Sequence, residues 1–452
     1  MGLFANKAVD LLSEGTNGNG EQGGDANDGE CFGGTNDKED CQAKTKNNKP
    51  KADKGFCFYF DDLTGHMNSL YIIYNSICFL FWAKNVKILG MLVSDFDYEL
   101  PEERVAKFPP KVRGTTRLCV LKRASGEIVD SWYQELDNFL SLGDVVILND
   151  TKVMQSRIFA ELKDGRPREL VVLEKHGDEP QRVMYRGKLH EGDELLALKA
   201  DFSGKANSSA KRTLELKGLE KTDCTIVIEK ILGNGIAEVK ARNKDGETLE
   251  LIRLAEAYGS VPLPPYLHRD ASEADKERYQ TVWAKNMGSA AAPTASLNMT
   301  DELLAKLKEK GVKICYLTLH VGLGTFLPIR TDEVEMHKMH SEWFCLPEET
   351  IEAIKEAKAG GRRVLAVGTT VARTLEYYAK TGKTKGEDDI FIYPGFKFEL
   401  VDMLLTNFHA PKSTVLMLAS AFAGWDKLSA AYKHCVKEKY NFLSYGDSML
   451  IC

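Results

Sequence analysis

Val312-Lys-Ile-Cys-Tyr-Leu-Thr-Leu319 is a mostly apolar run, and His320-Val-Gly-Leu-Gly-Thr-Phe-Leu-Pro328 follows it directly. A short apolar run of this kind predicts a strand that is buried on both faces, as in a parallel sheet. Open α/β sheets bind their ligands just past the carboxyl ends of such strands. We therefore expect the polar residues from His320 onward to lie at a functional site.

Two further imidazoles and a carboxylate follow shortly afterwards, in His337-Lys-Met-His340-Ser-Glu342. Imidazole titrates near neutral pH, so these side chains are candidates for acid and base catalysis. The His337 and His340 spacing also permits a metal site, although no third ligand is fixed by the pattern. Gly322-x-Gly324 predicts a tight turn rather than a dinucleotide-binding loop, because position 327 is leucine.

The chain beyond Thr300 alternates helices with strands, which predicts an α/β fold with a mixed, mainly parallel sheet and flanking helices. Thr300 is a typical helix N-cap, and Gly311 a typical stop. The predicted helices cover residues 301–310, 348–359, 368–380 and 413–423. The predicted strands cover residues 143–149, 312–319, 363–367, 389–393 and 403–406.

Polar or glycine-bearing residues follow four of these strands. They are His320, Gly368-Thr369-Thr370, Tyr393-Pro394-Gly395 and Asn407-Phe408-His409. Parallel strands present their carboxyl ends at one sheet edge, so we expect the four segments to converge there. Gly368-Thr-Thr opens a helix, whose N–H groups either bind an anion or form an ordinary cap. Asn407-Phe-His409 belongs either to the site or to a hydrogen-bonded turn with a structural histidine.

Residues 157–255 differ in texture from the rest of the chain. Short alternating runs at 169–174, 194–198, 213–216, 225–229 and 237–240 are separated by Gly, Asp and Lys turns. This pattern predicts a small antiparallel β-barrel or sandwich, inserted into the α/β domain. We therefore divide the chain into an extension (1–90), a large α/β domain (91–156 with 256–452) and an inserted barrel domain (157–255).

The N-terminal extension has a different composition. Residues 1–90 contain no arginine, and residues 15–55 are dominated by Gly, Asn, Asp, Glu and Lys, a composition that predicts disorder. The apolar run 70–82 is shorter than the roughly 20 residues that a membrane-spanning helix needs, which leaves an interfacial helix as an alternative. Met91 is a second candidate for the natural start of the protein.

Overall charge and cysteine usage restrict the function classes. The 452 residues carry a formal net charge of −6, so a nucleic-acid partner has to be held by a local basic patch. The ten cysteines show no C-x-x-C pair and no disulfide-framework spacing. This favours reduced thiols in a cytoplasmic protein and argues against a zinc ribbon.

From Met91 to Cys452 the chain resembles the S-adenosylmethionine:tRNA ribosyltransferase-isomerase family of queuosine biosynthesis, the QueA family. The resemblance rests on many collinear segments. They include Asp95-Phe-Asp-Tyr-Glu-Leu-Pro101, Asn149-Asp-Thr-Lys-Val153, Val261-Pro-Leu-Pro-Pro-Tyr266, Tyr279-Gln-Thr-Val282, Ala291-Ala-Pro-Thr-Ala295, His320 to Pro328, His337 to Glu342, Gly368-Thr-Thr370, Thr406-Asn-Phe-His409, Ser420-Ala-Phe-Ala-Gly424 and Ser444-Tyr-Gly-Asp447.

The resemblance implies a large α/β domain with an inserted β-barrel, and a particular reaction. The ribosyl part of S-adenosylmethionine is transferred to 7-aminomethyl-7-deazaguanine at the wobble position of tRNA and isomerised. Epoxyqueuosine forms, and adenine and methionine are released. The resemblance implies no metal or further cofactor, and we expect a monomer.

Such a reaction needs a base near the sulfonium carbon atoms and an acid for the leaving adenine. His340 with Glu342, or His320 with His409, are our candidates for these catalytic roles. Our candidates for substrate binding are Thr325, Phe326, Gly368, Thr369, Thr370, Arg373, Asn407, Tyr445, Asp447, Arg113, Arg117 and Arg157. Among them the arginines are suited to phosphate, and Phe326 and Tyr445 to stacking on a base.

The chain departs from the family pattern at two places. The family usually carries Ala-Pro-Thr-Ala-Gly-Leu-His-Phe at positions 292–299. This chain has Ser296, Asn298 and Met299 where the family has Gly, His and Phe. Asn298 can form hydrogen bonds but cannot shuttle a proton. Asn441 replaces an arginine near the C-terminus. These changes raise the alternative of a relative that binds tRNA or S-adenosylmethionine without turnover. A metal-assisted hydrolase that uses the same histidines is a third alternative.

Overall fold

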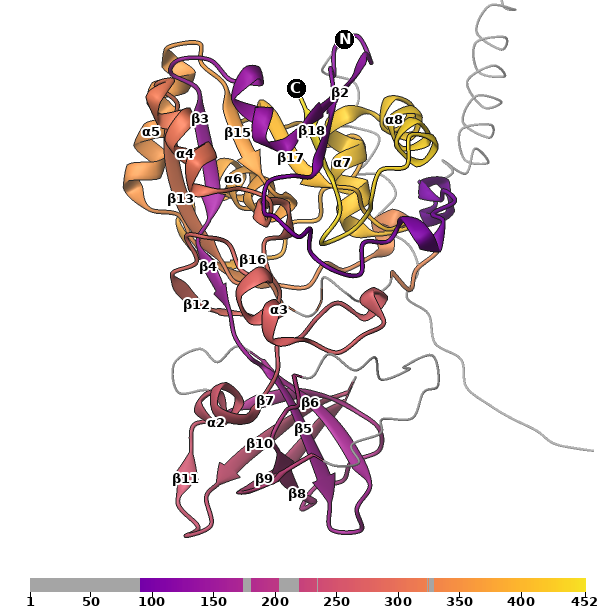
Figure 1. The fold of residues 1–452 in the computed structure, drawn as a ribbon, viewed down its shortest axis with the longest axis vertical. Coiled ribbons are helices and arrows are strands. Elements are labelled where there is room, and N and C mark those ends of the chain that lie inside the picture. Colours follow the sequence, from indigo (N-terminus) through magenta and orange to yellow (C-terminus); the bar gives the residue numbers. More distant parts are fainter. Residues whose placement is uncertain (1–89, 174–179, 203–218, 234, 323, 325–328) are drawn as a thin grey trace, which may run out of the picture. The chain divides into compact units, whose positions relative to one another are not determined.

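The apolar run that ends at Leu319 forms an inner strand of a mixed sheet (Figure 1). The computed structural model describes residues 90–173, 180–202, 219–233, 235–322, 324 and 329–452. The predictions for the N-terminal extension and for strand 213–216 therefore lie outside the described residues. So do the site candidates Thr325 and Phe326.

Within the described part of the chain, the main sheet has nine strands in the order β16-β14-β13-β3-β15-β17-β18-β1-β2. The strands are β1 (Arg117–Leu121), β2 (Ile128–Trp132), β3 (Val145–Asn149), β13 (Lys313–Leu319), β14 (Glu342–Cys345), β15 (Val364–Val367), β16 (Lys385–Asp388), β17 (Met403–Asn407) and β18 (Ser448–Ile451). The consecutive strands β13, β3, β15 and β17 pair in parallel, as do β1 and β18. The other pairings are antiparallel, which confirms the predicted mixed sheet.

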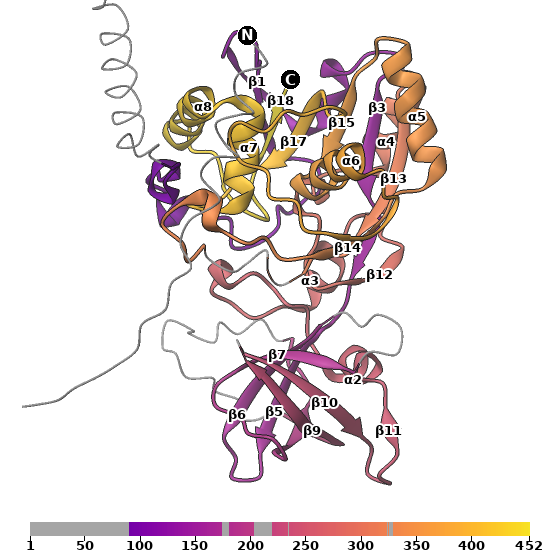
Figure 2. The ribbon, with the colours of Figure 1, turned by 180° about the vertical axis from the view of Figure 1, so that it is seen from behind.

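Helices cover both faces of this sheet. They are α4 (Asp301–Glu309), α5 (Glu348–Ala359), α6 (Thr369–Thr381), α7 (Thr414–Ala423) and α8 (Trp425–Lys437). Alternate residues of each strand point to opposite faces, so Ile147 and Leu317 pack with α5 to α8, whereas Val146 and Leu148 pack with α4. Figure 2 shows the sheet from the side that carries α6 and α7.

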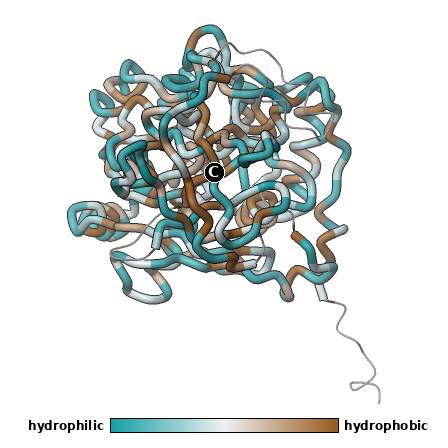
Figure 3. The backbone as a smooth tube through the Cα atoms, turned by 90° about the horizontal axis from the view of Figure 1, so that it is seen from below, coloured by the Kyte–Doolittle hydropathy of each residue, from teal (hydrophilic) through white to brown (hydrophobic). Residues whose placement is uncertain are grey.

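The sequence signals account for the ends of these helices. Thr300 Oγ1 accepts a hydrogen bond from Leu303 N at the start of α4, and Ser413 Oγ accepts one from Leu416 N at the start of α7. The predicted helices are confirmed to within a residue or two. In the tube of Figure 3, several hydrophobic segments lie toward the middle of the view, whereas many of the turns at its edge are hydrophilic.

One predicted strand is wrong. Residues 389–393 do not pair, and the edge strand β16 lies immediately before them, at Lys385–Asp388. Asp388 Oδ1 accepts a hydrogen bond from Ile390 N (3.0 Å), which turns the chain away from the sheet. The apolar side chains that suggested a strand pack against the core instead, and Ile392 is almost fully buried. Tyr393-Pro394-Gly395 consequently does not follow a strand, whereas the other three predicted strand ends do.

A second sheet closes into an antiparallel barrel, because β9 pairs with both β8 and β10. Its strands are β5 (Arg157–Leu162), β6 (Pro167–Val172), β7 (Arg182–Arg186), β8 (Glu194–Leu198), β9 (Lys221–Gly233) and β10 (Ile236–Arg242), with the short β11 (Thr248–Leu249) beside β10. The inserted barrel is thus confirmed. The exact domain bounds 91–156 with 256–452 and 157–255 stay predictions.

Shorter elements connect the barrel strands to the main sheet. They are α2 (Leu251–Tyr258), the 3-10 turn η4 (Pro265–Leu267), α3 (Glu273–Arg278), the paired strands β4 (Thr151–Val153) and β12 (Asn286–Ser289), and η5 (Thr294–Ser296). In the part of the chain that is described, no helix is long and apolar enough to cross a membrane.

Leu317 offers a test of the main core. Its side chain is fully buried in β13, so Leu317→Ala should lower the free energy of unfolding by about 2–5 kcal/mol through lost burial and a residual cavity. Lys313→Ala on the same strand is the control, and its exposed side chain predicts a change within about 0.5 kcal/mol. Urea unfolding followed by circular dichroism measures both. Equal effects of the two substitutions would contradict the assignment of β13 as an inner strand.

Candidate functional site

A cavity of about 600 Å³ opens at the carboxyl edge of the parallel strands. Segments that follow β13, β15 and β17 all contribute to its wall, as the strand ends predicted. The loops between β12 and α4 and around η4 also contribute, together with Val93, Tyr279, Leu443 and Ser444. The lining includes Tyr266, Tyr279, Ala292, Pro293, Thr294, Ala295, Val321, Gly368, Thr369, Thr370, Asn407, His409, Ser413 and Ser444. A cavity of this size suits a small organic ligand.

The cavity wall contains several groups that can donate hydrogen bonds. Gly368 begins α6 with φ of 102°, a backbone conformation that favours glycine, and Thr369 and Thr370 form the first turn. The N-terminal end of a helix carries partial positive charge and free N–H groups. No Asp or Glu side chain is found among the described residues that line the cavity. The wall is therefore suited to an anionic group.

In this wall, Asn407 Nδ2 and Thr370 Oγ1 have no hydrogen-bond partner among the described residues. Asn407 is only 3% exposed, and its Oδ1 is already engaged, because it accepts a hydrogen bond from Thr294 Oγ1 (2.8 Å). A buried donor without a partner costs on the order of 1–3 kcal/mol. A ligand that accepts a hydrogen bond from Asn407 would recover part of this cost.

His409 also lines the cavity, but it is held as a neutral ring. Burial lowers the pKa of His409 to about 3, so the imidazole carries no proton charge at neutral pH. Its Nε2 lies 2.8 Å from Thr406 Oγ1, and its backbone N–H donates to the Tyr432 hydroxyl. The side chain is therefore suited to hydrogen bonding rather than to acting as a cationic acid.

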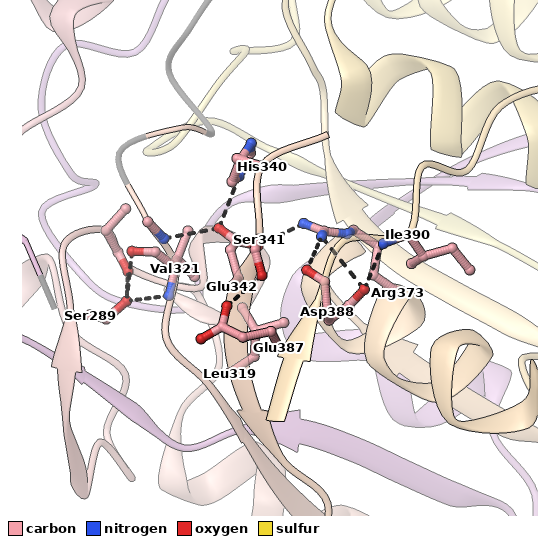
Figure 4. Close-up of polar contacts among 12 residues, drawn as sticks. Ser289, Leu319, Val321, His340, Ser341, Glu342, Arg373, Glu387, Asp388 and Ile390 are labelled. Carbon is pink, nitrogen blue, oxygen red and sulfur yellow. Dashed lines mark hydrogen bonds and ion pairs between the residues drawn. The ribbon is translucent and has the colours of Figure 1, made fainter. Parts of the chain in front are cut away.

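A buried ion-pair network lies beside the cavity and is centred on Glu342 (Figure 4). Arg373 donates to Glu342 Oε2 (2.6 Å), and its other nitrogen donates to the Asp388 carbonyl (3.2 Å). Gly322 N donates to Glu342 Oε1 (2.9 Å), and His340 Nε2 lies 3.2 Å from the same oxygen. Arg373 belongs to α6, one turn after Thr369 and Thr370, so the helix joins this network to the cavity wall.

The network determines the charge of its carboxylates. Burial opposes ionisation of Glu342, but Arg373, His340 and the Gly322 N–H together lower its pKa from 4.5 to about 2. At Asp388 burial prevails, and the pKa is raised above its usual value despite the nearby Arg373. Glu342 is therefore an anion at neutral pH, next to the imidazole of His340.

The predicted glycine-rich turn has a packing reason. A Cβ atom on Gly324 would lie 2.3 Å from His340 Cγ, which is closer than two non-bonded carbon atoms can approach. Only glycine therefore fits at this position beside the His340 ring. His320 is positioned differently. Its Nδ1 lies 2.8 Å from Thr151 Oγ1, and its ring stacks on Trp343 with centroids 5.1 Å apart. Val321, the next residue, reaches the cavity wall.

Comparison with known proteins connects this geometry to a family. The family model described as queuosine biosynthesis protein matches residues 93–451. This chain belongs to that family. The resemblance inferred from the sequence motifs is thereby confirmed.

Individual relatives match over their full length. An S-adenosylmethionine:tRNA ribosyltransferase-isomerase from Chlorobium phaeobacteroides is 50% identical over 368 residues, which is 80% of this chain and 100% of the relative. A protein of the same name from Francisella philomiragia is 42% identical over 364 residues, with the same shares covered. A solved structure of S-adenosylmethionine tRNA ribosyltransferase from Thermotoga maritima is 31% identical, covers 79% of this chain and 100% of that chain, and has a TM-score of 0.43.

The other arginine candidates of the queuosine biosynthesis chain have partners within the protein. Arg113 donates to the carbonyls of Gln280 and Leu297, at 2.9 and 2.8 Å. Arg117 donates to the Glu438 carbonyl (2.7 Å) and lies over the Tyr440 ring. Arg157 forms ion pairs with Glu169 and Asp270, each at 2.8 Å. These contacts join distant segments, and phosphate binding by the three residues stays a prediction.

Tyr445 and Asp447 are also engaged away from the cavity wall. The Tyr445 hydroxyl donates to Asp275 Oδ1 (2.7 Å), and Asp447 accepts from the backbone N–H groups of Arg117 and Asn441, both at 2.7 Å. Burial raises the pKa of Asp447 above its usual value. The structure brings together Gly368, Thr369, Thr370, Asn407 and His409 in the cavity, and His340, Glu342 and Arg373 in the network.

Two departures from the family pattern lie close to the cavity but outside its lining. Ser296 is fully buried at the end of η5, and its Oγ makes no hydrogen bond to a described residue. Asn298 is 2% exposed and donates to the Gly446 carbonyl (3.1 Å). Neither is among the described residues that line the cavity. Asn441 is exposed.

Three neighbours of the site were not among the residues predicted from the sequence, namely Tyr266, Thr294 and Asp388. Tyr266 and Thr294 stand in segments that carry the family resemblance, which was the available signal. Asp388 had no sequence signal of its own. Within the described ranges, no group of three or more His, Cys, Asp or Glu side chains is arranged to hold a metal ion.

Glu342→Gln should lower the free energy of unfolding at pH 7 by about 3–5 kcal/mol, because it removes the nearer of the two carboxylates beside the buried Arg373. The depressed pKa of Glu342 gives this difference a defined pH dependence. The stabilisation is fully present above pH 4.5 and is lost as the pH falls toward 2, where the folded-state carboxylate takes up a proton. Urea titrations of the wild type and the variant at several pH values measure this difference in unfolding free energy. A difference that stayed constant down to pH 2 would contradict the assignment of Glu342 as a buried anion.

Proposed function

We propose that this chain transfers the ribosyl moiety of S-adenosylmethionine to 7-aminomethyl-7-deazaguanine at the tRNA wobble position and isomerises it. The product is epoxyqueuosine, and adenine and methionine are released. Full-length similarity to relatives named S-adenosylmethionine:tRNA ribosyltransferase-isomerase carries this proposal. The cavity at the carboxyl edge of the parallel strands supports it, because its volume and the hydrogen-bond donors in its mostly apolar wall suit a small charged cosubstrate.

The cavity is our proposed cosubstrate site. The first turn of α6 and Asn407 Nδ2 offer donors to the carboxylate of the methionine portion. The apolar wall around Ala292 and Pro293, with Tyr266, then receives the rest of the molecule. No metal is part of the proposal.

His340 and Glu342 are our proposed acid–base pair. The anionic Glu342 is held by Arg373 and Gly322, and its Oε1 lies 3.2 Å from His340 Nε2, where it can orient the ring. A neutral His340 can remove a proton from carbon next to the sulfonium, and the resulting imidazolium can return one to the leaving group. His409 contributes a neutral hydrogen-bonding group to the cavity wall.

The proposed function also bears on cellular location and assembly. We propose a cytoplasmic monomer that binds tRNA and S-adenosylmethionine, since its substrate is a tRNA and its described cysteines are free thiols. We also propose that residues 157–255 act as an inserted domain.

Nucleoside analysis tests the proposed function. The full chain is incubated with S-adenosylmethionine and tRNA that carries 7-aminomethyl-7-deazaguanine. The tRNA is then digested to nucleosides, and their masses are measured by mass spectrometry. We expect a mass gain that matches the epoxycyclopentane group, with one adenine released per modified base. Binding of tRNA or cosubstrate without any mass gain would instead support the non-catalytic alternative. The double substitution Ser296→Gly with Asn298→His would then show whether turnover returns.

Asn407→Ala tests the proposed carboxylate contact. A hydrogen bond to a charged group is worth about 1.5–3 kcal/mol, so KM for S-adenosylmethionine should rise roughly 10- to 150-fold. Asn407→Asp should be worse, because it places a negative charge against the carboxylate. Asn243→Ala, on an exposed barrel turn, is the control. Rates of adenine release give KM for the wild type and the three variants. A rise in KM for tRNA alone would indicate that Asn407 contacts an anionic group of the RNA instead.

A further inference from the structure

A short basic segment with an exposed aromatic residue lies outside the site described above. Residues 104–113 carry four positive side chains (Arg104, Lys107, Lys111 and Arg113) and no acid, although the chain as a whole has a net charge of −6. Within this segment Phe108 is 63% exposed and Val112 is 62% exposed. Single exposed apolar residues are common on protein surfaces, but an aromatic ring among lysines is the usual surface for single-stranded nucleic acid.

The Phe108 ring rests on a fixed support. The guanidinium carbon of Arg269 lies 4.3 Å from the ring centroid, and the same group donates to the Lys107 carbonyl (2.6 Å). Arg269 is itself held by two hydrogen bonds to the buried Asp275, at 2.7 and 2.8 Å. The structure therefore holds one face of the ring against a buried cation while much of the side chain stays exposed.

The backbone on the other side of Phe108 is restrained as well. Pro109 and Pro110 follow it, and proline fixes its own φ and restricts the residue before it. Arg278 donates to the Pro110 carbonyl (2.8 Å). Carbonyls on both sides of Phe108 are thus held by arginines, so a partner that stacks on the ring pays little ordering entropy.

This segment is connected to the cavity wall at two points. Ala106 N donates to the Phe442 carbonyl (3.3 Å), and the next residues after Phe442, Leu443 and Ser444, line the cavity. Arg269 follows Tyr266 by three residues, and the Tyr266 hydroxyl lies 2.5 Å from Ser444 Oγ. Three residues span at most about 11 Å, so the support of Phe108 lies close to the cavity.

We propose that residues 107–112 form a docking surface for the single-stranded RNA next to the base that is modified. This inference rests on the proposed function, in which that base is the wobble nucleotide of the anticodon loop. Phe108 stacks on a neighbouring base, and Lys111 contacts a backbone phosphate. Sequence-tolerant stacking on aromatic rings and Lys–phosphate attraction are the two usual components of such binding.

The neighbouring charges fit this assignment. Lys107 pairs with the exposed Glu102 (3.1 Å), a weak surface pair that a phosphate can replace. The Arg113 guanidinium donates to the Gln280 and Leu297 carbonyls and so supports the segment from within the protein. Lys111 is exposed and has no recorded partner among the described residues, which leaves its ammonium group available to RNA.

Substitutions at Phe108 test the stacking contact. Phe108→Ala should weaken binding of the substrate tRNA roughly 5- to 150-fold, the range expected for one lost base–aromatic stack. Phe108→Trp should retain affinity, whereas Phe108→Leu, which keeps an apolar side chain without a π face, should not. Trp132→Ala removes a comparably exposed aromatic residue on β2 and is the matched control. The dissociation constant of each full-length variant is measured by filter binding.

Lys111→Ala tests the phosphate contact. Loss of one phosphate contact should reduce the slope of log Kd against log salt concentration by about 0.7. Lys308→Ala, an exposed lysine on α4, should leave the slope unchanged. KM for S-adenosylmethionine should stay within twofold of wild type in all these variants, because none of the residues lines the cavity.

Several results would overturn the inference and leave the proposed function intact. One is wild-type tRNA affinity in Phe108→Ala, in a protein that still modifies tRNA. Another is equal affinity of the Trp and Leu variants, which would exclude stacking. A change in the concentration-dependent elution of Phe108→Ala on gel filtration, without a change in tRNA affinity, would assign the surface to contact between copies of the chain. A wild-type protein that neither binds nor modifies tRNA would instead refute the proposed function itself.

Discussion

Parallel pairing of β3 with both β13 and β15 is the constraint on which the rest of the molecule depends. These strands are far apart in the sequence, and parallel strands always require a crossover connection. The connection from β3 to β13 contains the whole barrel, yet the two strands pair directly. Because β13, β15 and β17 run in the same direction, the segments after all three lie at one edge. The cavity is a direct consequence of this arrangement.

The Glu342–Arg373 pair joins that edge to the rest of the fold. Glu342 lies at the start of β14, Arg373 lies on α6, and Gly322 follows β13, so one carboxylate connects three elements. A buried ion pair is costly unless its remaining hydrogen-bonding groups are satisfied. Here the cost is compatible with a functional role, because the pair positions both the His340 ring and the helix whose first turn lines the cavity.

In our proposals, the cavity and the Phe108 segment provide two different kinds of binding surface. The cavity wall offers buried donors and the partial positive charge of α6, without a carboxylate among its described residues, and suits one small anionic group. The Phe108 segment is exposed, basic and rigid, and suits a polyanion that arrives from solvent. A protein with a negative net charge can bind RNA in this way only if its cations are concentrated locally.

Local sequence signals determined a large part of this protein. Apolar runs, caps and glycine stops predicted β3, β13, β15, β17 and the helices between them, and the polar strand ends predicted the residues around Gly368 and Asn407. These predictions succeed because burial on both faces and helix capping are visible within a few residues. Tertiary structure alone decided the rest. Residues 389–393 look like a strand, yet Asp388 turns them onto the core. His409 looks like a titrating residue, yet burial keeps it neutral. The sequence shows that Asn298 can form hydrogen bonds, but only the fold gives its partner, the Gly446 carbonyl. Desolvation and pairing across long sequence separations depend on neighbours that no local pattern reveals.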